Sequence, residues 1–299
     1  MSTSSSAPLA VVTGASTGIG KALARQFVEH GYDVVVAADE DTIHDAAREL
    51  SAGGRLVEPV EVDLATPEGV EGLAARVELT GRPVDALALN AGIGVHGRFV
   101  DNDLADELRL VDLNVRSTVH LAHLLVRPMV DRGRGRLLVT SSVVATGPGP
   151  FHATYAASKA FGHSFAEAIR HELKDSGVTV TSLMPGATDT EFFARADMGG
   201  TRVAEGPKDD PDDVARDAFE ALMAGKASVV AGRWQNRVLA EVNTHLPDTV
   251  AAAVAARVSE PGERGSQVAS RAAHHSSRAA RASSSDIGPW SRRRSRRNR

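Results

Sequence analysis

The sequence predicts an α/β protein built on a doubly wound parallel sheet, because short, continuously apolar runs alternate along it with segments of helical periodicity. Continuous apolar runs are typical of parallel strands that helices cover on both faces. A second observation is a glycine-rich turn that joins the first apolar run to the first helical segment. With 299 residues, 42% of them hydrophobic, the chain is long enough to bury a sizeable core.

The first unit, from Leu9 to Ala38, is predicted to form a strand, a glycine-rich turn, a helix and a second strand. The alternation continues as far as Pro185 and then weakens. Residues 188–210 are rich in glycine, aspartate and charge, and we expect a mobile lid there, before a helix that starts near Asp212. Between these limits the pattern predicts strands at 55–64, 84–92, 135–142 and 178–186, and helices at 67–79, 104–129 and 155–177.

Charge and composition divide the chain. Residues 261–299 contain ten arginines and only two acids, Glu263 and Asp286, although the whole chain has a net charge of -4. This segment has almost no large apolar side chains, so it cannot offset the entropy of ordering. We therefore predict a flexible N-terminus at 1–8, one domain at 9–258 and a disordered basic tail at 259–299.

Several classes of protein are disfavoured by the sequence. The chain has no cysteine, which rules out disulfides and thiolate metal sites and fits a cytoplasmic protein. The first residues have no basic segment typical of a signal peptide, and the late apolar stretch at 250–256 is too short to span a bilayer. The eleven histidines form no metal-binding motif, so we expect no catalytic metal.

Three glycines, Gly14, Gly18 and Gly20, follow the first predicted strand and open the first predicted helix. A phosphate requires this arrangement, in which the backbone approaches closely and the amides at a helix N-terminus point towards its charge. The turn could equally be only a tight connection. Its place in the first strand–helix unit favours a nucleotide site, which would also include Ser16, Thr17 and Ile19.

Acidic residues follow the second predicted strand, at Asp39, Glu40 and Asp41, with nothing basic beside them. A carboxylate at this position can bind the two hydroxyls of an adenosine ribose, whereas a basic side chain would accept a 2′-phosphate. Because three acids would repel such a phosphate, the sequence favours NAD over NADP. The alternative is that these acids solvate the loop or cap the next helix.

Polar and small residues also follow the third and fourth predicted strands. Asp63, which Leu64 follows, could meet an adenine amino group or cap the next helix, and the sequence leaves both roles open. Asn90, Ala91 and Gly92 end the fourth strand. Small residues there would let the backbone approach a cofactor, although Asn-Ala-Gly is also an ordinary turn.

A phenol and an ammonium stand four residues apart in the stretch YAASK, at Tyr155 and Lys159. On a helix, this spacing brings both to one face. A nearby ammonium favours the phenolate form of tyrosine, which with its ordinary pKa of about 10 is a poor base near neutral pH. A solvated surface pair would show the same spacing, so the rest of the chain must decide.

Together these motifs resemble the short-chain dehydrogenase/reductase family. The resemblance runs in order from about Leu9 to Gly186 and more loosely to about Val258. Ser142 precedes Tyr155 by thirteen positions, as the family pattern requires. The matching residues are TGASTGIG at 13–20, Asp63, NAG at 90–92, Asn114, Ser142, YAASK at 155–159 and PGATDT at 185–190.

The resemblance implies a single Rossmann-like domain and hydride transfer between a nicotinamide and an alcohol or carbonyl carbon of a small molecule. It implies that Tyr155 is the general acid and base, that Lys159 also holds the nicotinamide ribose, and that Ser142 fixes the substrate oxygen. Asn114 would bond the backbone and hold a water that relays protons to Lys159. The residues implied to cover the nicotinamide carboxamide are Pro185, Gly186, Thr190 and, as a nearby substitute, Thr188.

The sequence departs from the family pattern in three places. Leu89 stands where the family commonly has a first asparagine before Asn90, and Ala38 aligns with the family's common NAD-selecting acid, one position before Asp39. The arginine-rich tail has no counterpart in the family pattern. Ser141 offers a second hydroxyl beside Ser142, and only the spacing to the tyrosine selects the latter.

Few charges occur in the segments expected to form the substrate pocket, and GPGPFH at 147–152 indicates a partly apolar wall. We therefore expect an uncharged, partly apolar alcohol or carbonyl substrate and no membrane partner; the resemblance also implies a homo-oligomer, dimer or tetramer. One alternative is a catalytically inactive dinucleotide-binding regulator, disfavoured because all four implied catalytic residues are present. The other is a protein that binds nucleic acid through its tail, disfavoured because no aromatic platform accompanies the arginines.

Overall fold

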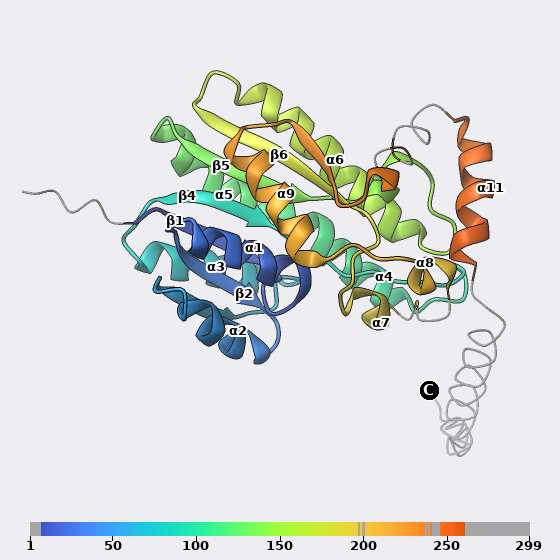
Figure 1. The fold of residues 1–299 in the computed structure, drawn as a ribbon, viewed down its shortest axis with the longest axis horizontal. Helices are drawn as coiled ribbons and strands as arrows, with labels where there is room; N and C mark the ends of the chain where they lie inside the picture. The colour runs from blue at the N-terminus through green and yellow to red at the C-terminus, as the bar shows by residue number, and fades with distance from the viewer. Residues whose placement is uncertain are drawn as a thin grey trace, which may run out of the picture. The chain divides into compact units, whose positions relative to one another are not determined.

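The computed structural model describes residues 7–196, 198, 201–236, 238, 240 and 246–260. Seven strands form one parallel sheet in the order β3-β2-β1-β4-β5-β6-β7 (Figure 1). This confirms the predicted doubly wound α/β fold, while the predictions for 1–6 and 261–299 lie outside the described residues. The strands are β1 (Leu9–Thr13), β2 (Asp33–Ala38), β3 (Val57–Glu61), β4 (Val84–Leu89), β5 (Gly135–Thr140), β6 (Val178–Pro185) and β7 (Ser228–Ala231).

Helices cover both faces of the sheet. Alternate residues of each strand point to opposite faces, so that both faces present apolar side chains for helices to pack against. In β1, Ala10 and Val12 pack against one group of helices, whereas Leu9 and Val11 pack against the other. The first group is α1 (Gly18–Glu29), α2 (Thr42–Ser51) and α9 (Pro211–Met223), and α1 and α9 lie side by side in Figure 1. The second group is α3 (Pro67–Leu79), α5 (Ser117–Asp131) and α6 (Ala153–Glu172).

The strand order reverses between β1 and β4, which are neighbours in the sheet although two strands separate them in sequence. Ligands of doubly wound sheets bind in the crevice at the carboxyl ends of the strands beside such a reversal. The fold therefore directs attention to the residues that follow Thr13 and Leu89.

The predicted helix at 104–129 is interrupted in the structure. It consists of α4 (Leu104–Val111), a π-helical turn η1 (Asp112–Arg116) and α5. Such single π turns occur frequently at functional sites. Asn114 lies inside the turn and is only 6% exposed.

Several elements were not predicted from the sequence, since their local signals are weak. Helix α2 has only ten residues, of which Ile43, Ala46, Ala47 and Leu50 are buried, and β7 has only four residues. Two one-turn helices, α7 (Phe192–Arg195) and α8 (Arg202–Glu205), lie within the predicted lid. After β5 the chain forms a short 3-10 turn, η2 (Val143–Thr146), and after the sheet it forms α11 (Asp248–Ser259), which packs against α8.

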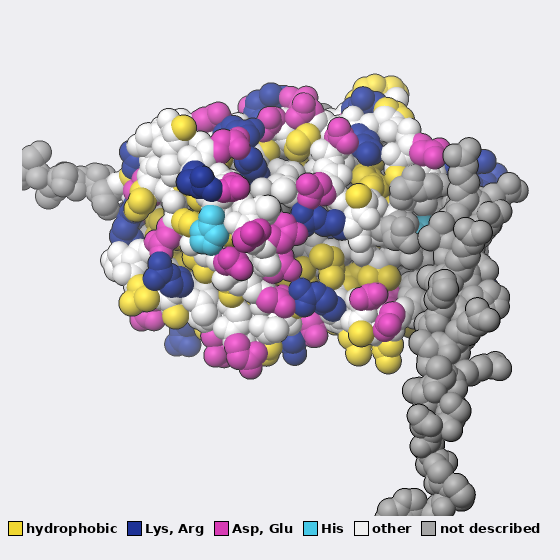
Figure 2. Space-filling model, turned by 90° about the horizontal axis from the view of Figure 1, so that it is seen from below, with side chains coloured by type: hydrophobic (Ala, Val, Ile, Leu, Met, Phe, Trp, Pro, Cys, Tyr) yellow, Lys and Arg dark blue, Asp and Glu magenta, His cyan; other side chains and the backbone are white. Residues whose placement is uncertain are grey.

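Charged side chains of both signs are interspersed over the surface seen in Figure 2. Many form exposed ion pairs, such as that of Arg25 in α1 with Asp212 at the start of α9, 2.6 Å apart. Within the described residues, no helix is both long and apolar enough to cross a membrane. No group of three or more histidines or acids in that part of the chain is arranged to hold a metal ion.

Candidate active site

One large cavity, of about 980 Å³, opens at the carboxyl ends of the strands around the β1–β4 reversal. Every predicted site residue lines it except Gly18 and Asn114. Segments that are far apart in sequence therefore meet in one place, as the fold prediction requires. The predicted residues that line the cavity are Gly14, Ser16, Thr17, Ile19, Gly20, Asp39, Asp63, Leu64, Asn90, Ala91, Gly92, Ser142, Tyr155, Lys159, Pro185, Gly186, Thr188 and Thr190.

The glycine-rich turn after β1 has no room for side chains. Gly14 has a φ of 64°, and a Cβ atom there would lie 2.8 Å from the Cα of Ala91. A Cβ at Gly20 would lie 1.9 Å from the carbonyl oxygen of Gly14. Thr17, the N-cap residue of α1, forms no side-chain capping bond. Open helix amides beside a close-approaching backbone suit a phosphate, so these residues fit the pyrophosphate of a dinucleotide.

Asn90 and Thr13 hold the turn in place. The Oγ1 of Thr13 accepts hydrogen bonds from the backbone N–H groups of Asn90 and Ala91, both at 3.0 Å. The Asn90 side chain donates to the carbonyl of Thr13 at 3.1 Å and accepts from the hydroxyl of Thr140 at 3.2 Å. The amide of Asn90 thus joins the ends of β1, β4 and β5. This role of Thr13 was not predicted from the sequence, because a threonine at the end of a buried strand gives no signal of it.

Arg109, which is distant in sequence, places a basic side chain beside the acids after β2, although nothing basic adjoins them in the sequence. Its guanidinium donates to Asp63 at 2.8 Å and to Asp39 at 3.2 Å. The hydrogen bond from Arg109 is the main cause that holds the pKa of Asp63 below its usual range. Thr66, not Asp63, caps α3, by accepting from the N–H of Gly69 at 3.0 Å, so the capping alternative for Asp63 is wrong.

A second arginine connects the predicted lid to the loop after β2. Arg195 in α7 forms an ion pair of 2.7 Å with Glu40 and a second with Glu191 on its own turn. Thr190 lies against the glycine-rich turn, where a Cβ at Gly18 would come within 2.8 Å of its methyl group. This part of the lid therefore spans the cavity from the turn to the acids that follow β2.

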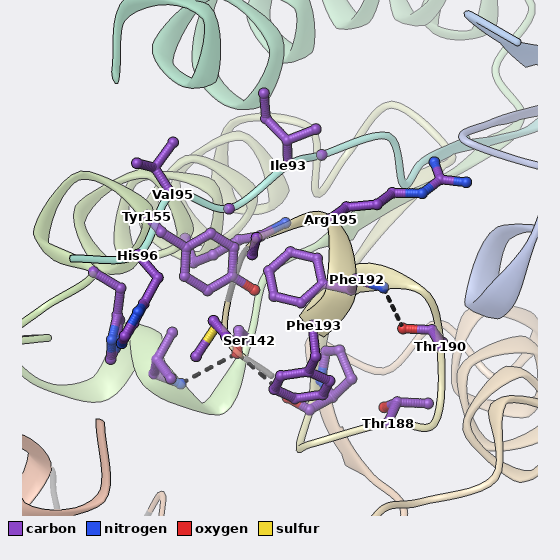
Figure 3. A pocket seen from close by; sticks show the side chains of 18 of the residues that line it. Ile93, Val95, His96, Ser142, Tyr155, Thr188, Thr190, Phe192, Phe193 and Arg195 are labelled. Carbon is purple, nitrogen blue, oxygen red and sulfur yellow. Dashed lines mark hydrogen bonds between the residues drawn. The ribbon is translucent and has the colours of Figure 1, made fainter. Parts of the chain in front are cut away.

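Tyr155 and Lys159 lie one turn apart on α6, and the hydroxyl of Tyr155 points towards Ser142 (Figure 3). The ammonium of Lys159 donates to the carbonyl of Thr140 at 2.9 Å and lies 5.7 Å from the centre of the Tyr155 ring. Burial raises the pKa of Tyr155 to about 12, although Ser142 acts in the opposite direction, and burial lowers the pKa of Lys159 to about 8. The lowered tyrosine pKa expected from the sequence is therefore not found in the protein alone, because desolvation dominates.

Ser141 and Ser142 differ in how their hydroxyls are used. Ser141 donates to the backbone carbonyl of Lys159 at 2.7 Å and is almost fully buried. Among the described residues, Ser142 makes long hydrogen bonds, accepting from the N–H of Val144 at 3.3 Å and donating to the carbonyl of Pro185 at 3.4 Å (Figure 3). Of the two hydroxyls, that of Ser142 is the one available to a ligand.

Asn114 lies behind the cavity wall. Its side chain accepts from the N–H of Ile93 and donates to the carbonyl of the same residue, both at 2.9 Å, and donates to the hydroxyl of Ser158 at 3.0 Å. Gly92 fits between Asn114 and Lys159, since a Cβ there would lie 3.1 Å and 3.2 Å from their polar atoms. Asn114 thus fixes the loop after β4 against α6.

The wall beyond Tyr155 is mostly apolar. The Phe192 ring lies 5.2 Å from the Tyr155 ring, and Phe193 packs edge-on against Phe192 (Figure 3). Two phenylalanines in an otherwise polar segment were the available sequence signal for this contact. Helix α11, which was not predicted, completes the wall through Ala251, Val254, Ala255 and Ser259.

The loop after β6 forms the remaining side. Thr188 is buried and donates to the carbonyl of Gly186 at 3.1 Å, while Thr190 accepts from the N–H of Phe192 at 3.3 Å (Figure 3). A Cβ at Gly186 would lie 2.3 Å from the side chain of Asn236. This glycine is therefore needed for the loop to pass between the cavity and Asn236.

Comparison with known proteins gives a consistent result. A family model described as short chain dehydrogenase matches residues 8–199. A probable oxidoreductase, EphD, of Mycobacterium tuberculosis is 35% identical over 188 residues, which are 62% of this chain and 32% of the relative. The chain thus corresponds to about a third of that relative's length. Dehydrogenase/reductase SDR family member 7B of Rattus norvegicus is 32% identical over 250 residues, 79% of this chain and 77% of the relative.

Solved structures of similar proteins share the fold. A short-chain dehydrogenase from Sphingobium yanoikuyae in complex with NADPH superposes with a TM-score of 0.70 at 29% identity, over 75% of this chain and 87% of the other. A putative NAD(P) dependent gluconate 5-dehydrogenase from Beutenbergia cavernae, with bound NADP, has a TM-score of 0.66 at 30% identity and covers 75% and 94%.

Proposed function

Because the chain belongs to the short-chain dehydrogenase/reductase family, an NAD(P)-dependent family of oxidoreductases, we propose that Tyr155 is its general acid and base in hydride transfer. The substrate is an alcohol or carbonyl compound that is small and uncharged. The observation that carries this proposal is one cavity, also lined by the glycine-rich turn, in which the hydroxyl of Tyr155 points towards Ser142 and the ammonium of Lys159 lies beside the Tyr155 ring.

Tyr155 and Ser142 hold the oxygen of the substrate between them. With a pKa of about 12, the buried phenol of Tyr155 is neutral at pH 7 and can donate its proton to a carbonyl oxygen during reduction. Ser142 donates a second hydrogen bond to the same oxygen, where negative charge develops. When bound, the nicotinamide supplies or accepts the hydride.

Lys159 holds a ribose and assists the return of the proton. It is 7% exposed, and among the described residues it forms no ion pair and donates only to Thr140. An ammonium has three N–H donors, so donors remain for a pair of ribose hydroxyls. During oxidation its charge favours the phenolate of Tyr155. Asn114 acts as a positioning residue, because it secures the loop that passes beside the ammonium.

NAD is the preferred cofactor. Asp39 is the residue proposed to bind the adenosine ribose. Glu40 and Asp41 follow it in the loop after β2, and Asp63 follows the neighbouring strand β3. Arg109 and Arg195 supply two positive charges there, and both are already paired with carboxylates. Because the four acids still outnumber the two arginines, this end of the cavity disfavours a 2′-phosphate.

The alternatives are less well supported. A regulator that binds a dinucleotide without catalysis has no use for a serine hydroxyl aimed at the space beside a buried tyrosine. Nucleic-acid binding was proposed only for the tail, which lies outside the described residues, and the surface in Figure 2 mixes both signs of charge. A cytoplasmic location and a homo-oligomer stay predictions from the sequence.

The experiment is a panel of alcohols and ketones followed through the nicotinamide absorbance, with NAD(H) and NADP(H) in parallel. Wild type and Tyr155→Phe are compared, with cofactor binding measured separately by fluorescence. We expect turnover with wild type only, and similar cofactor binding by both. Turnover that survives Tyr155→Phe undiminished would remove the tyrosine from the mechanism, and a clear preference for NADP would contradict the role given to Asp39.

A further inference from the structure

His152 lines the cavity three residues before Tyr155. The side chain is 93% buried, at 7% exposure, and its Nδ1 has no hydrogen-bond partner among the described residues. A buried polar atom without a partner destabilises the fold, because it loses its hydrogen bonds to water. Native proteins contain few such atoms. The Nδ1 is closed off from the cavity, so a ligand there would meet the ring at its other nitrogen, Nε2, for which the described residues supply no hydrogen bond.

The turn that precedes α6 is built around this ring. Phe151 has a φ of 65°, which is costly for a residue with a side chain. Its carbonyl accepts from the N–H of Gly97 at 2.7 Å, and this bond joins the turn to the loop after β4. A Cβ at Gly149 would lie 2.5 Å from the Cβ of Ala156 and 2.7 Å from the Nε2 of His152, so this glycine leaves space for both side chains. The turn therefore accommodates the imidazole beside the start of α6.

His152 is a neutral hydrogen-bonding group. Burial, and secondly the nearby charge of His96, lower its pKa to about 4. A neutral imidazole presents one N–H donor and one acceptor. His96 is occupied differently: its Nε2 lies 2.7 Å from the carbonyl of Ser259, and because a carbonyl only accepts, this nitrogen carries a proton. His96 thus secures the end of α11, whereas His152 stays available.

The surroundings of His152 suit a hydrocarbon body. Val144, Phe192, Phe193 and Val254 line the cavity as well, and the Phe192 ring lies 5.2 Å from that of Tyr155. The His152 and Tyr155 ring centres are 6.3 Å apart, so one small molecule can contact both side chains. Arg202, on α8, also lines the cavity but is exposed, and it would be the partner of a charged group instead.

We infer that His152 binds a second oxygen of the substrate, so that the preferred substrates are mainly hydrocarbon alcohols or ketones carrying an additional uncharged hydroxyl or carbonyl group. This inference rests on the proposed function and specifies its substrate class. The reacting oxygen lies at Tyr155 and the second oxygen at His152, with the apolar wall around the carbons between them.

The experiment uses pairs of ketones that differ only in the second oxygen: cyclohexanone with 4-hydroxycyclohexanone, and 2-octanone with its 5-, 6-, 7- and 8-hydroxy derivatives. The ratio of kcat/KM within each pair is measured for wild type, His152→Leu and His152→Gln. The matched control is His171→Leu, an exposed histidine of the same helix that does not line the cavity. We expect wild type to prefer at least one hydroxylated ketone, and His152→Leu to lower that ratio by about tenfold or more.

Two further readouts separate binding from a structural role. His152→Gln, which keeps a donor and an acceptor, should retain part of the preference. The melting temperature of His152→Leu should not fall below that of wild type, because the variant removes an unpaired nitrogen from the interior. His171→Leu should change neither the ratio nor the melting temperature.

If His152→Leu changes kcat/KM equally for both ketones of every pair, the inference is overturned, while the dehydrogenase function still stands. So would a preference for keto acids that Arg202→Ala abolishes and His152→Leu does not change. Wild type that reduces only the plain ketones would also overturn it. Failure of the proposed function is distinguishable, since it would appear as turnover that Tyr155→Phe does not reduce.

Discussion

The ammonium of Lys159 lies 5.7 Å from the centre of the Tyr155 ring, and burial shifts the pKa of each group towards its uncharged form. The pair is thus held by the fold in surroundings that disfavour both charges. Because the protein alone stabilises neither the ammonium nor the phenolate, a charged ligand that binds here can shift the pKa values of both groups. The consequences for stability can be measured without a substrate.

Replacing Lys159 by methionine should change how stability depends on pH. The folded pKa of Lys159, about 8, lies below its ordinary value of 10.5. Below pH 8 the buried ammonium therefore destabilises the fold, and from pH 8 to 10.5 this penalty disappears, because only the unfolded chain keeps the proton. The free energy of unfolding of Lys159→Met relative to wild type should be higher at pH 7 than at pH 10, by up to about 3 kcal/mol.

Denaturant titrations at the two pH values measure this difference. Lys174→Met, an exposed lysine just after α6, is the control and should show no such dependence. A Lys159→Met effect equal at both pH values would contradict the burial of a charged ammonium.

The two neighbouring serines should respond differently to alanine. Ser142→Ala removes a hydroxyl with only long hydrogen bonds, so stability should change little, while kcat/KM should fall by roughly 100-fold or more if the hydroxyl contacts the developing negative charge. Ser141→Ala removes a buried hydrogen bond to the carbonyl of Lys159, which keeps its own bond within α6, and should cost about 1 kcal/mol of stability. Thermal melts and steady-state kinetics on both variants test this, and the reverse pattern would exchange their roles.

Much of this site could be predicted because its signals are local. Gly14 and Gly20 indicate that two backbone segments approach closely, as the structure shows. The four-residue spacing of Tyr155 and Lys159 predicts one helical turn, and both residues lie in α6. The parallel sheet then brings the strand ends together whatever the intervening residues are. These positions depend on short-range geometry, which a single sequence contains.

Contacts that depend on tertiary placement could not be predicted. Arg109 reaches Asp39 across 70 residues of sequence, from a helix whose position follows only from packing. His152 looks like any histidine before a helix until its burial and its unpaired nitrogen are seen. Helix α11 is rich in alanine and gives little periodic signal, although it forms a wall of the cavity.

Cofactor preference should depend on the balance between Asp39 and Arg109. Asp39→Asn removes one of the two carboxylates that Arg109 contacts and frees the guanidinium for a 2′-phosphate. The ratio of kcat/KM for NADP to that for NAD should rise by about five- to tenfold. Adding Arg109→Ala to this variant should cancel most of the gain. A ratio that the single variant leaves unchanged would indicate that Asp39 does not contact the ribose.

Asn114→Leu should loosen the loop that follows β4. The substitution leaves the N–H and the carbonyl of Ile93 without partners and removes the hydrogen bond to Ser158. We expect a loss of about 2–4 kcal/mol of stability, together with a lower kcat at temperatures where the variant is folded. Asn114→Asp keeps the acceptor for the N–H of Ile93 and should lose less. Hydrogen exchange at the Ile93 amide reports the loop directly, and unchanged protection in Asn114→Leu would contradict its role.

The ion pair of Glu40 and Arg195 should hold the lid over the cofactor cavity. The pair joins the loop after β2 to α7, whose Phe192 packs on Tyr155, so closing the lid and forming the apolar wall are one event. Both side chains are at least a third exposed, and such pairs contribute no more than about 1 kcal/mol.

Glu40→Gln and Arg195→Met should each raise the dissociation constant of the cofactor by about two- to fivefold, and the double variant by no more than the larger single effect. Glu191→Gln, which removes the other partner of Arg195 within its own turn, is the control and should show no coupling to Glu40. Fully additive effects of Glu40→Gln and Arg195→Met would mean that the pair does not secure the lid when the cofactor binds.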